Sequence, residues 1–431
     1  MRNNIIHIGA NELKYEIRGI IKIAKQIEKI KGKMIWENIG DPVAKGHKLP
    51  DWMKEIIMKE TQNDLSYGYC PTKGLDETRE FLAEKNNKIG GAQIKAEDII
   101  FFNGLGDAIS TFYQYLNMQT RVIGPEPAYS THSSAEAAHS GSPHLTYELQ
   151  PQNNWMPNLE DLYNKVKYNP LISGILIINP DNPTGSVYPR SVLEEIVQIA
   201  RKFDLFIIVD EIYMKTVYNG QQYTALCEVI EDVPGVAMKG ISKEFPWPGS
   251  RCGWIESYNI NKDAVFAEFI NSLENAKMLE VCSTTLPQKV IPAVLQHPQY
   301  ETYHQKRNQF FEKRSQELFD TLKDVKGLTI NMTNGSFYSS PVFEIEHLHK
   351  NQSLPISGDL YQIITPELEN VENDKKFALY LMANTGICVV PLSSFNTKLK
   401  GFRMTLLESD DKIFTDTCQK LKTAIRNYLL S

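Results

Sequence analysis

The stretch Gly240–Gly253, GISKEFPWPGSRCG, brings a lysine and an arginine to the two sides of a Pro/Gly turn. Lys243 directly follows Ser242, and Arg251 stands eight residues after the lysine. A lysine that forms a Schiff base needs a fixed position and surroundings that favour its neutral amine. An arginine a short loop away can hold a phosphate through two parallel hydrogen bonds. An ordinary surface lysine and arginine would show the same letters, so the rest of the chain has to decide.

The size and charge of the chain restrict its class. Its 431 residues are too many for one simple core, so we expect two subdomains. A net charge of −6 offers no basic field to nucleic acid or to anionic lipid. No apolar run approaches the roughly 20 residues of a membrane span, and the N-terminus lacks the core of a signal peptide. We therefore expect a cytoplasmic protein with neither nucleic acid nor membrane as a partner.

The cysteines are scattered, without the paired spacing of a metal site. The sequence has no Cys-x-x-Cys and no His-x-x-x-His cluster, which argues against a structural zinc ion. We expect no metal site, and we interpret the six cysteines as reduced thiols of a cytoplasmic protein: Cys70, Cys227, Cys252, Cys282, Cys388 and Cys418.

Apolar segments alternate with helical patterns through the first part of the chain. Nearly continuous apolar strands with helices between them predict a mostly parallel sheet that is buried on both faces. Ligands of such sheets bind outside the carboxyl ends of the strands, and here a polar cluster follows each predicted strand. The five strand segments are DIIFF (Asp98–Phe102), RVIG (Arg121–Gly124), GILII (Gly174–Ile178), LFIIV (Leu205–Val209) and GVAMKG (Gly235–Gly240).

The turn after the first of these strands is a candidate phosphate site. Asn103-Gly104-Leu105-Gly106-Asp107 follows the strand at once and leads into a helix that we expect to begin near Ala108. A strand, a glycine-containing turn and a helix N-terminus together present backbone N–H groups to a phosphate. The full dinucleotide fingerprint is not completed here, so this match alone is weak.

Beyond about Gln296 the pattern changes to charged helical stretches and shorter strands, which predicts a smaller α+β domain. The segment from His347 to Asn373 is polar, and we expect an irregular insertion there. We predict three parts: residues 1–45 join the small domain, residues 46–300 form the large domain, and residues 301–431 form the small domain.

The polar residues at the predicted strand ends match the needs of pyridoxal phosphate. Lys243 would hold its aldehyde as a Schiff base. Asp210 would pair with the protonated ring nitrogen, because a buried carboxylate without a cationic partner would be too costly. Tyr213 and Asn182 could bond the phenolic oxygen of the ring, and Tyr129 could stack on it. The phosphate would be shared by Gly104, Leu105, Gly106, Ser242 and Arg251. Asp210 and Tyr213 could instead be merely structural.

Four motifs carry a resemblance to a known family: NPDNPTG (Asn179–Gly185), DEIY (Asp210–Tyr213), SKEFPWPGSRCG (Ser242–Gly253) and FRMTLL (Phe402–Leu407). In this order and spacing they resemble the fold-type I, class I and II aminotransferases, from about Tyr15 to about Glu408. The resemblance implies an α/β fold with a large, mostly parallel, seven-stranded type of sheet between helices, a smaller α+β domain, and bound pyridoxal phosphate.

The N-terminal part is closest in pattern to alanine (glutamate–pyruvate) aminotransferases, through YEIRG (Tyr15–Gly19), IGDP (Ile39–Pro42) and GYCPTKG (Gly68–Gly74). The resemblance implies that Arg403 binds the α-carboxylate of the substrate and that the loop at Gly40 closes over it.

Further roles come from the same resemblance. Tyr69 would reach across a homodimer interface to the cofactor phosphate of the partner subunit. His132 resembles the position that supports the ring-binding Asp210, although it could be an ordinary packed histidine. Tyr15 and Arg18 lie three residues apart in a predicted helical segment, where they would share a face. We expect them at the substrate side, with Arg18 taking the distal carboxylate of glutamate; a helix-face pair without a ligand is the alternative.

The reaction that this pattern predicts is a ping-pong transfer of an amino group between an L-amino acid and a 2-oxo acid. Two other aminotransferase types, aspartate and aromatic, and a carbon–sulfur β-lyase on the same scaffold remain open alternatives. A cofactor-binding transcription regulator would need an N-terminal DNA-binding domain, for which about 40 residues are too few. One departure from the family lies beside the lysine, where Pro246, Trp247 and Pro248 replace less rigid residues and could reshape its approach.

Overall fold

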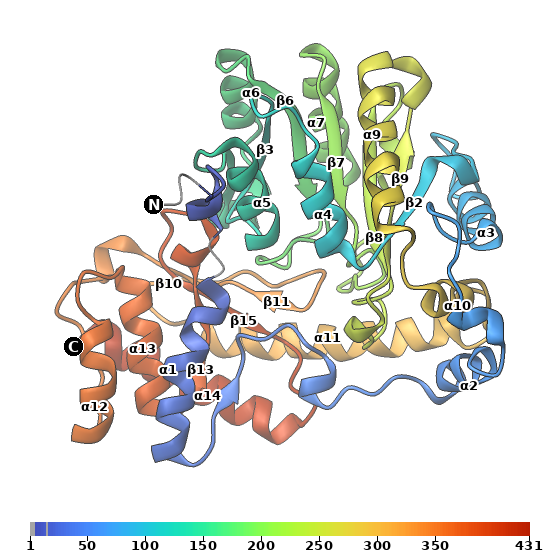
Figure 1. The fold of residues 1–431 in the computed structure, drawn as a ribbon. Coiled ribbons are helices and arrows are strands. Elements are labelled where there is room, and N and C mark those ends of the chain that lie inside the picture. Colours follow the sequence, from blue (N-terminus) through green and yellow to red (C-terminus); the bar gives the residue numbers. More distant parts are fainter. Residues whose placement is uncertain (1–4, 14–15) are drawn as a thin grey trace.

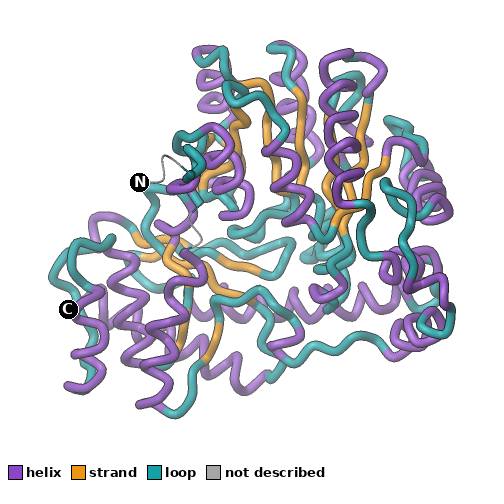
Figure 2. The backbone as a smooth tube through the Cα atoms, in the orientation of Figure 1, coloured by secondary structure: helices purple, strands orange, loops and turns teal. Residues whose placement is uncertain are grey.

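The computed structural model describes residues 5–13 and 16–431, and the side chains of residues 14–19 lie outside the described part. Figure 1 shows a large sheet flanked by helices in the upper part of the molecule and a second group of helices and short strands below it. The tube view separates the same two parts, because the long strands stand side by side above while the short ones gather at the lower left (Figure 2).

The large sheet has the strand order β2-β9-β8-β7-β6-β3-β4-β5. Neighbouring strands from β8 to β4 are parallel, while β9 runs antiparallel to β2 and β8, and β5 runs antiparallel to β4. The predicted mostly parallel sheet is confirmed, and the two-residue β5 makes it eight-stranded. Its strands are β2 (Ile99–Phe102), β3 (Arg121–Glu126), β4 (Thr146–Gln150), β5 (Met156–Pro157), β6 (Ile172–Ile178), β7 (Phe206–Asp210), β8 (Gly235–Gly240) and β9 (Gly253–Tyr258).

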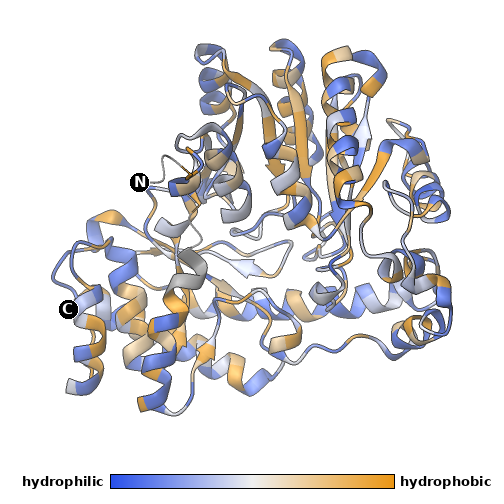
Figure 3. Ribbon diagram, viewed as in Figure 1, coloured by the Kyte–Doolittle hydropathy of each residue, from blue (hydrophilic) through white to orange (hydrophobic). Residues whose placement is uncertain are grey.

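Alternate side chains of these strands enter two different hydrophobic cores, one on each face of the sheet. In β7, Ile207 and Val209 pack on one face, and Ile208 packs on the other. This two-residue alternation follows from the pleat, and burial on both faces explains why the strand is apolar throughout. In Figure 3 these strands are accordingly coloured towards the hydrophobic end of the scale, between helices of mixed colour.

Helices supply the outer layer on both faces. On the face of Ile208 lie α4 (Leu105–Gln114), α5 (Ser130–Ser140) and α9 (Ala264–Glu280). The helices that pack into the core of the opposite face are α2 (Asp51–Glu60), α3 (Asp76–Asn87), α6 (Leu159–Tyr168), α7 (Arg190–Lys202), α8 (Leu226–Val229) and α10 (Thr285–Leu295).

A further core holds the second part of the molecule together. The N-terminal helix α1 (Glu16–Lys31) buries Ile20, Ala24 and Ile27 there, a spacing that places all three on one helix face. Strand β1 (Ile35–Trp36) then pairs with β13, so the beginning of the chain joins its last third. The other elements are α11 (Tyr300–Leu322), α12 (Gly358–Ile364), α13 (Asn373–Thr385), α14 (Asp411–Leu430), β10 (Leu328–Thr329), β11 (Tyr338–Ser339), β12 (Val342–Phe343), β13 (Ile387–Cys388), β14 (Val390–Pro391) and β15 (Phe402–Thr405).

Two local predictions were wrong. The segment 347–373 is not simply an irregular polar insertion, because it contains α12 and buries Leu348, Leu354 and Leu360 in the core of the second part. Leu348, Leu354 and Leu360 reach the core, and Gln352 between them is also buried, with its amide donating to the backbone oxygen of His347 over 2.9 Å. Helix α4 begins at Leu105 rather than near Ala108, because Gly104 takes a positive φ of 84° and ends the preceding turn there.

No helix among the residues that the structure describes is both long enough and apolar enough to cross a membrane.

Candidate active site

A cavity of about 520 Å³ opens at the carboxyl ends of β6 and β7, where their last residues, Ile178 and Asp210, are paired. Ligands of parallel sheets bind at this edge, because the loops and helix N-termini that follow the strands converge there. Leu105, Gly106, Ile109, Tyr129, Thr131, Ile178, Asn182, Asp210, Ile212, Tyr213, Ser242, Lys243, Pro248 and Arg251 line the cavity. The structure therefore brings nine of the predicted site residues to one place from distant parts of the chain.

Lys243 reaches into this cavity from the loop after β8, and its Nζ donates to the backbone oxygen of Gly40 over 2.7 Å. Burial is the main cause that lowers the pKa of its amine to about 8, and Asp41 opposes this effect. Three cations lower the pKa further: Arg403, Arg307 and Arg251. The lysine is thus poised to lose a proton near neutral pH, which a nucleophile and a proton carrier both require.

Asp210 ends β7, and its carboxylate is held in place from two sides. Its Oδ2 lies 3.2 Å from Nε2 of His132, which is completely buried, and its Oδ1 accepts from the N–H of Ile212 over 3.1 Å. Helix α5 supplies His132 one turn after Tyr129, which borders the cavity. A buried carboxylate fixed in this way offers a negative charge to a cationic group in the cavity.

Tyr213 and Tyr338 meet at the side of the cavity that faces the second part of the molecule. The hydroxyl of Tyr213 donates to that of Tyr338 over 3.3 Å, and their rings lie edge to face. Burial raises the pKa of the Tyr213 phenol well above its usual value. The phenol therefore stays protonated and can donate a hydrogen bond to an oxygen in the cavity.

Arg403 stands on β15, and its buried guanidinium joins both parts of the molecule. Nη1 donates to Oδ1 of Asn182 over 3.2 Å, and Nη2 donates to the backbone oxygen of Asn38 over 2.7 Å. The guanidinium carbon lies 4.4 Å from the ring centroid of Tyr338 and 5.1 Å from that of Phe395. Two aromatic faces and two acceptors fix its plane, as recognition of a carboxylate by a guanidinium fork requires.

The start of α4, directly after the turn that follows β2, forms another part of the cavity wall through Leu105 and Gly106. A Cβ on Gly104 would lie 2.8 Å from Nη2 of Arg251, so a side chain at this position would collide with the arginine. Directly behind the glycine, α4 begins at Leu105 with its N–H groups pointing outward. Backbone donors at a helix N-terminus and one arginine together form an anion site.

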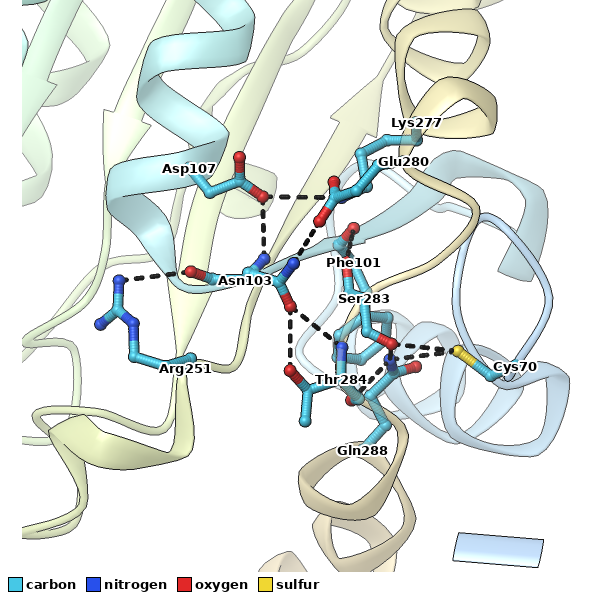
Figure 4. A network of polar contacts seen from close by, with 10 residues as sticks. All are labelled: Cys70, Phe101, Asn103, Asp107, Arg251, Lys277, Glu280, Ser283, Thr284 and Gln288. Carbon is cyan, nitrogen blue, oxygen red and sulfur yellow. Dashed lines mark hydrogen bonds and ion pairs between the residues drawn. The ribbon is translucent and has the colours of Figure 1, made fainter. Parts of the chain in front are cut away.

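Asn103 was missed by the sequence analysis as a separate contributor, and Figure 4 shows it at the centre of a polar network behind this anion site. Its backbone oxygen accepts from Nη2 of Arg251 over 3.2 Å. Its Oδ1 accepts from both the N–H and the hydroxyl of Thr284, over 3.0 and 2.9 Å. Its N–H donates to Asp107 over 2.9 Å, and its amide also contacts Glu280. The position of Asn103 in the sequence, between the predicted strand and Gly104, could have identified this residue.

Several predicted site residues lie elsewhere. Tyr69 does not line the cavity, and its residue surface is 86% exposed. Gly40 contributes through its backbone oxygen, and a Cβ there would lie 2.0 Å from the hydroxyl of Tyr338. Tyr15 lies outside the described residues, as does the side chain of Arg18. Thr131 and three isoleucines, Ile109, Ile178 and Ile212, also line the cavity and were not singled out from the sequence.

The segment Pro246-Trp247-Pro248 after the lysine contributes to one wall of the cavity. Pro248 lines the cavity, whereas Trp247 packs against the large-domain core. The described residues contain no group of three or more His, Cys, Asp or Glu side chains that could hold a metal ion.

Comparison with known proteins defines the class. Residues 33–419 match the family model described as aminotransferase class I and II, so the chain belongs to this family. It is an enzyme of the transaminase type, as the motifs at Asn179–Gly185 and Ser242–Gly253 predicted.

Individual relatives agree with this assignment over nearly the whole length. The chain is 57% identical over 430 residues to an uncharacterized aminotransferase of Methanocaldococcus jannaschii, with 100% of both chains covered. It is 30% identical over 404 residues to the glutamate-pyruvate aminotransferase of Escherichia coli, covering 93% of this chain and 92% of that one. A solved alanine aminotransferase from Pyrococcus furiosus has a TM-score of 0.85 at 24% identity, covering 99% of this chain and 100% of that one, so the fold is the same.

Proposed function

We propose that the cavity binds pyridoxal phosphate and that the enzyme transfers amino groups between an L-amino acid and a 2-oxo acid of the alanine and glutamate type. The observation that carries this proposal is the placement of Lys243 in one cavity with the Asp210 carboxylate and the Arg251 cation. An amine, a carboxylate and an anion site at fixed positions are the three groups that this cofactor needs from a protein.

The donor and acceptor set fits the cofactor. Arg251, Ser242 and the N-terminus of α4 would hold the phosphate, and Asp210 would hold the ring nitrogen. Tyr129 borders the cavity, where its ring could lie against the cofactor ring. Gly104 leaves the space that the arginine occupies. A cavity of about 520 Å³ has the size of other small-ligand sites in proteins.

When bound, pyridoxal phosphate supplies an electron sink for the bond that breaks at the substrate α-carbon. Asp210 strengthens that sink by keeping its charge opposite a protonated ring nitrogen, and His132 keeps the carboxylate in place. Lys243 would act as the base for the proton on the substrate α-carbon, because its lowered pKa makes the neutral amine available. The O–H of Tyr213, which here donates to the hydroxyl of Tyr338, would turn to donate to the ring oxygen.

The substrate side would be formed by Arg403 and by the loop that contains Asn38 and Gly40. Arg403 would bind the α-carboxylate, because its guanidinium is already oriented by Asn182 and by the backbone of Asn38. Gly40 closes the opposite side, where only a residue without a side chain fits beside Tyr338.

The alanine and glutamate specificity is supported by the 30% identity to the Escherichia coli glutamate-pyruvate aminotransferase and by the N-terminal motifs. To test it, purified enzyme with the cofactor is incubated with glutamate and pyruvate, and the formation of alanine and 2-oxoglutarate is measured against aspartate, tyrosine and cystathionine as alternative donors. We expect the glutamate–pyruvate pair to be fastest. Faster turnover of aspartate or tyrosine, or release of thiol from cystathionine, would contradict the assignment.

The homodimer with shared active sites also remains a proposal. It is supported by the exposure of Tyr69, which leaves the side chain available to a partner subunit. Inactive Lys243→Ala chains are mixed with inactive Tyr69→Ala chains and allowed to exchange. Hybrid dimers contain one site with both residues intact, so part of the activity should return. Exchange without recovery would show that Tyr69 serves its own subunit.

A further inference from the structure

Helix α11 connects the two parts of the molecule and passes beneath the large sheet (Figure 1). At its beginning, Tyr300 packs in the core of the large part, and further along Phe311 and Leu318 pack in the core of the second part. Between Tyr300 and Phe311 the helix buries two ionisable side chains, His304 and Arg307. Residues 300, 304 and 307 share one face of the helix, so they meet the same neighbour.

That neighbour is the loop that carries the lysine. Glu244 follows Lys243 directly, and its buried carboxylate accepts a hydrogen bond from the hydroxyl of Tyr300. The Nε2 of His304 lies 3.4 Å from the same carboxylate. The residue after the predicted catalytic lysine is therefore anchored to α11 through its side chain.

Arg307 adds a second anchor, through the main chain, and extends it to another loop. Its Nη1 donates to the backbone oxygen of Glu244 over 3.0 Å and to Oγ1 of Thr216 over 3.3 Å. Thr216 in turn donates its N–H to the backbone oxygen of Tyr213 over 2.7 Å. One guanidinium thus joins the loop of Lys243 to the loop of Tyr213.

Burying the Arg307 guanidinium costs free energy that a purely structural contact would not require. Arg307 is only 7% exposed, its Nη2 has no hydrogen-bond partner among the described residues, and burial lowers its pKa. Apolar residues of similar volume often pack such positions at no loss of stability. What they cannot provide is a permanent charge with donors in a fixed planar geometry.

We propose that Arg307 is a positioning residue for the reaction, which fixes the Lys243 loop against the Tyr213 loop and places a permanent positive charge behind the lysine. This inference rests on the proposed function for the role of Lys243, but the contacts that define it do not. Nothing in the sequence motifs singled out this arginine.

The positive charge of Arg307 should change the pKa of Lys243 in a known direction. A cation near an amine favours the neutral form, so Arg307 acts in the same direction as burial on the pKa of Lys243. Removing this charge should raise that pKa. The charged and titratable groups around the amine, which stay in place in such a variant, are Asp41, Arg251, Arg403, Asp210 and Tyr213.

The experiment compares Arg307→Met, which removes charge and donors, with Arg307→Lys, which keeps the charge on a single flexible ammonium. In the full-length chain stripped of cofactor, the rate of amine labelling at Lys243 is measured against pH by mass spectrometry. We expect a midpoint near pH 8 for the unchanged protein. The midpoint should rise by about 0.5–1 unit in Arg307→Met and stay nearly unchanged in Arg307→Lys.

Kinetics of the cofactor-loaded enzyme provide the second readout. Both variants should lose about 10- to 100-fold in kcat, because neither holds the two loops together, while KM for the amino acid changes by less than about threefold. Lys306→Met, at the exposed neighbouring position of α11, is the matched control and should behave like the unchanged enzyme. Thr216→Val removes one acceptor at nearly constant volume and should lower kcat by about threefold, which keeps the test available if the arginine variants do not fold.

An unchanged labelling midpoint together with an unchanged kcat in Arg307→Met would overturn the inference. In Thr216→Val, a kcat equal to that of the unchanged enzyme would overturn it as well. If the unchanged protein transfers no amino group but the midpoint still moves in Arg307→Met, the proposed function fails while the positioning of Lys243 by Arg307 stands.

Discussion

The two ends of the cavity are built in different ways. The proposed cofactor end consists of residues at or shortly after the ends of strands of one sheet, such as Asp210, the last residue of β7, and Lys243, three residues after β8. The proposed substrate side, beside the cavity lining, is assembled from segments that are far apart in the chain, since Arg403 bonds the lining residue Asn182 and also the backbone of Asn38, across 365 positions. The sheet fixes the geometry of the proposed cofactor end, whereas the geometry of the proposed substrate side depends on how the two parts of the molecule pack together.

This contrast predicts that substitutions at the two places change different kinetic constants. Substitutions at the cofactor end should lower kcat for every substrate, because they change the chemistry that all substrates share. Substitutions at the substrate end should change kcat/KM and separate one substrate pair from another.

The largest effect is expected at the cofactor end, from Asp210→Asn. The amide cannot stabilise a protonated ring nitrogen, so kcat should fall by about 10²- to 10³-fold for all amino acids while the cofactor stays bound. Steady-state kinetics and the absorbance of bound cofactor check both statements. His132→Gln, which acts only through this carboxylate, should cost less, and Asp204→Asn on the surface is the control. Near-normal turnover in Asp210→Asn would show that the residue is structural.

Arg18 is a substrate-side residue only by the sequence-based expectation, and Arg18→Ala tests it because the substitution should then separate the two substrate pairs. A desolvated charge-assisted bond to a carboxylate is worth roughly 1.5–3 kcal/mol, or about 10- to 150-fold in specificity. The substitution should lower kcat/KM for glutamate and 2-oxoglutarate by that factor and change alanine and pyruvate far less. Arg403→Lys is the matched comparison and should lower both pairs, because both share the α-carboxylate. Equal losses for both pairs in Arg18→Ala would remove Arg18 from the distal site.

The smallest effect on activity is expected at Asp181, a fully buried carboxyl that precedes Asn182 in the chain and does not line the cavity. Burial raises the pKa of this carboxyl to about 7, against the hydrogen bonds from Thr184. The folded chain then holds a proton that the unfolded chain loses above about pH 4, so the contribution of Asp181 to stability should fall as the pH rises from about 4 to 7 and then level off.

Asp181→Asn should remove this dependence, which amounts to at most about 4 kcal/mol for a shift of about three units. Urea unfolding at pH 4.5 and pH 8 measures it, and kcat should stay within about threefold. If the difference in stability between the unchanged protein and Asp181→Asn is the same at the two pH values, the raised pKa is contradicted.

The cofactor end could be predicted from the sequence better than the substrate side. The family and the parallel sheet were accessible, because apolar strands and the polar residues that follow them are neighbours in the chain. Asp210 and Lys243 could be assigned to one edge of the sheet from this pattern alone, and the structure places them in one cavity.

The rest required contacts that no local pattern contains. Arg307 reads as one charge among many on an amphipathic helix, and only the packing of α11 against two loops brings it behind Lys243. Tyr338 gains its place through the pairing of β11 with β15. The start of α4 depended on the conformation of Gly104, and α12 depended on a core supplied by other segments.

The central claim is that Lys243 carries the cofactor, and one measurement tests it most directly. The enzyme loaded with pyridoxal phosphate is reduced with borohydride, digested, and mapped by mass spectrometry. The pyridoxyl label should be found on the peptide that contains Lys243, and it should disappear from that peptide in Lys243→Ala. A label on another lysine of the unchanged protein, with Lys243 free, would contradict the account.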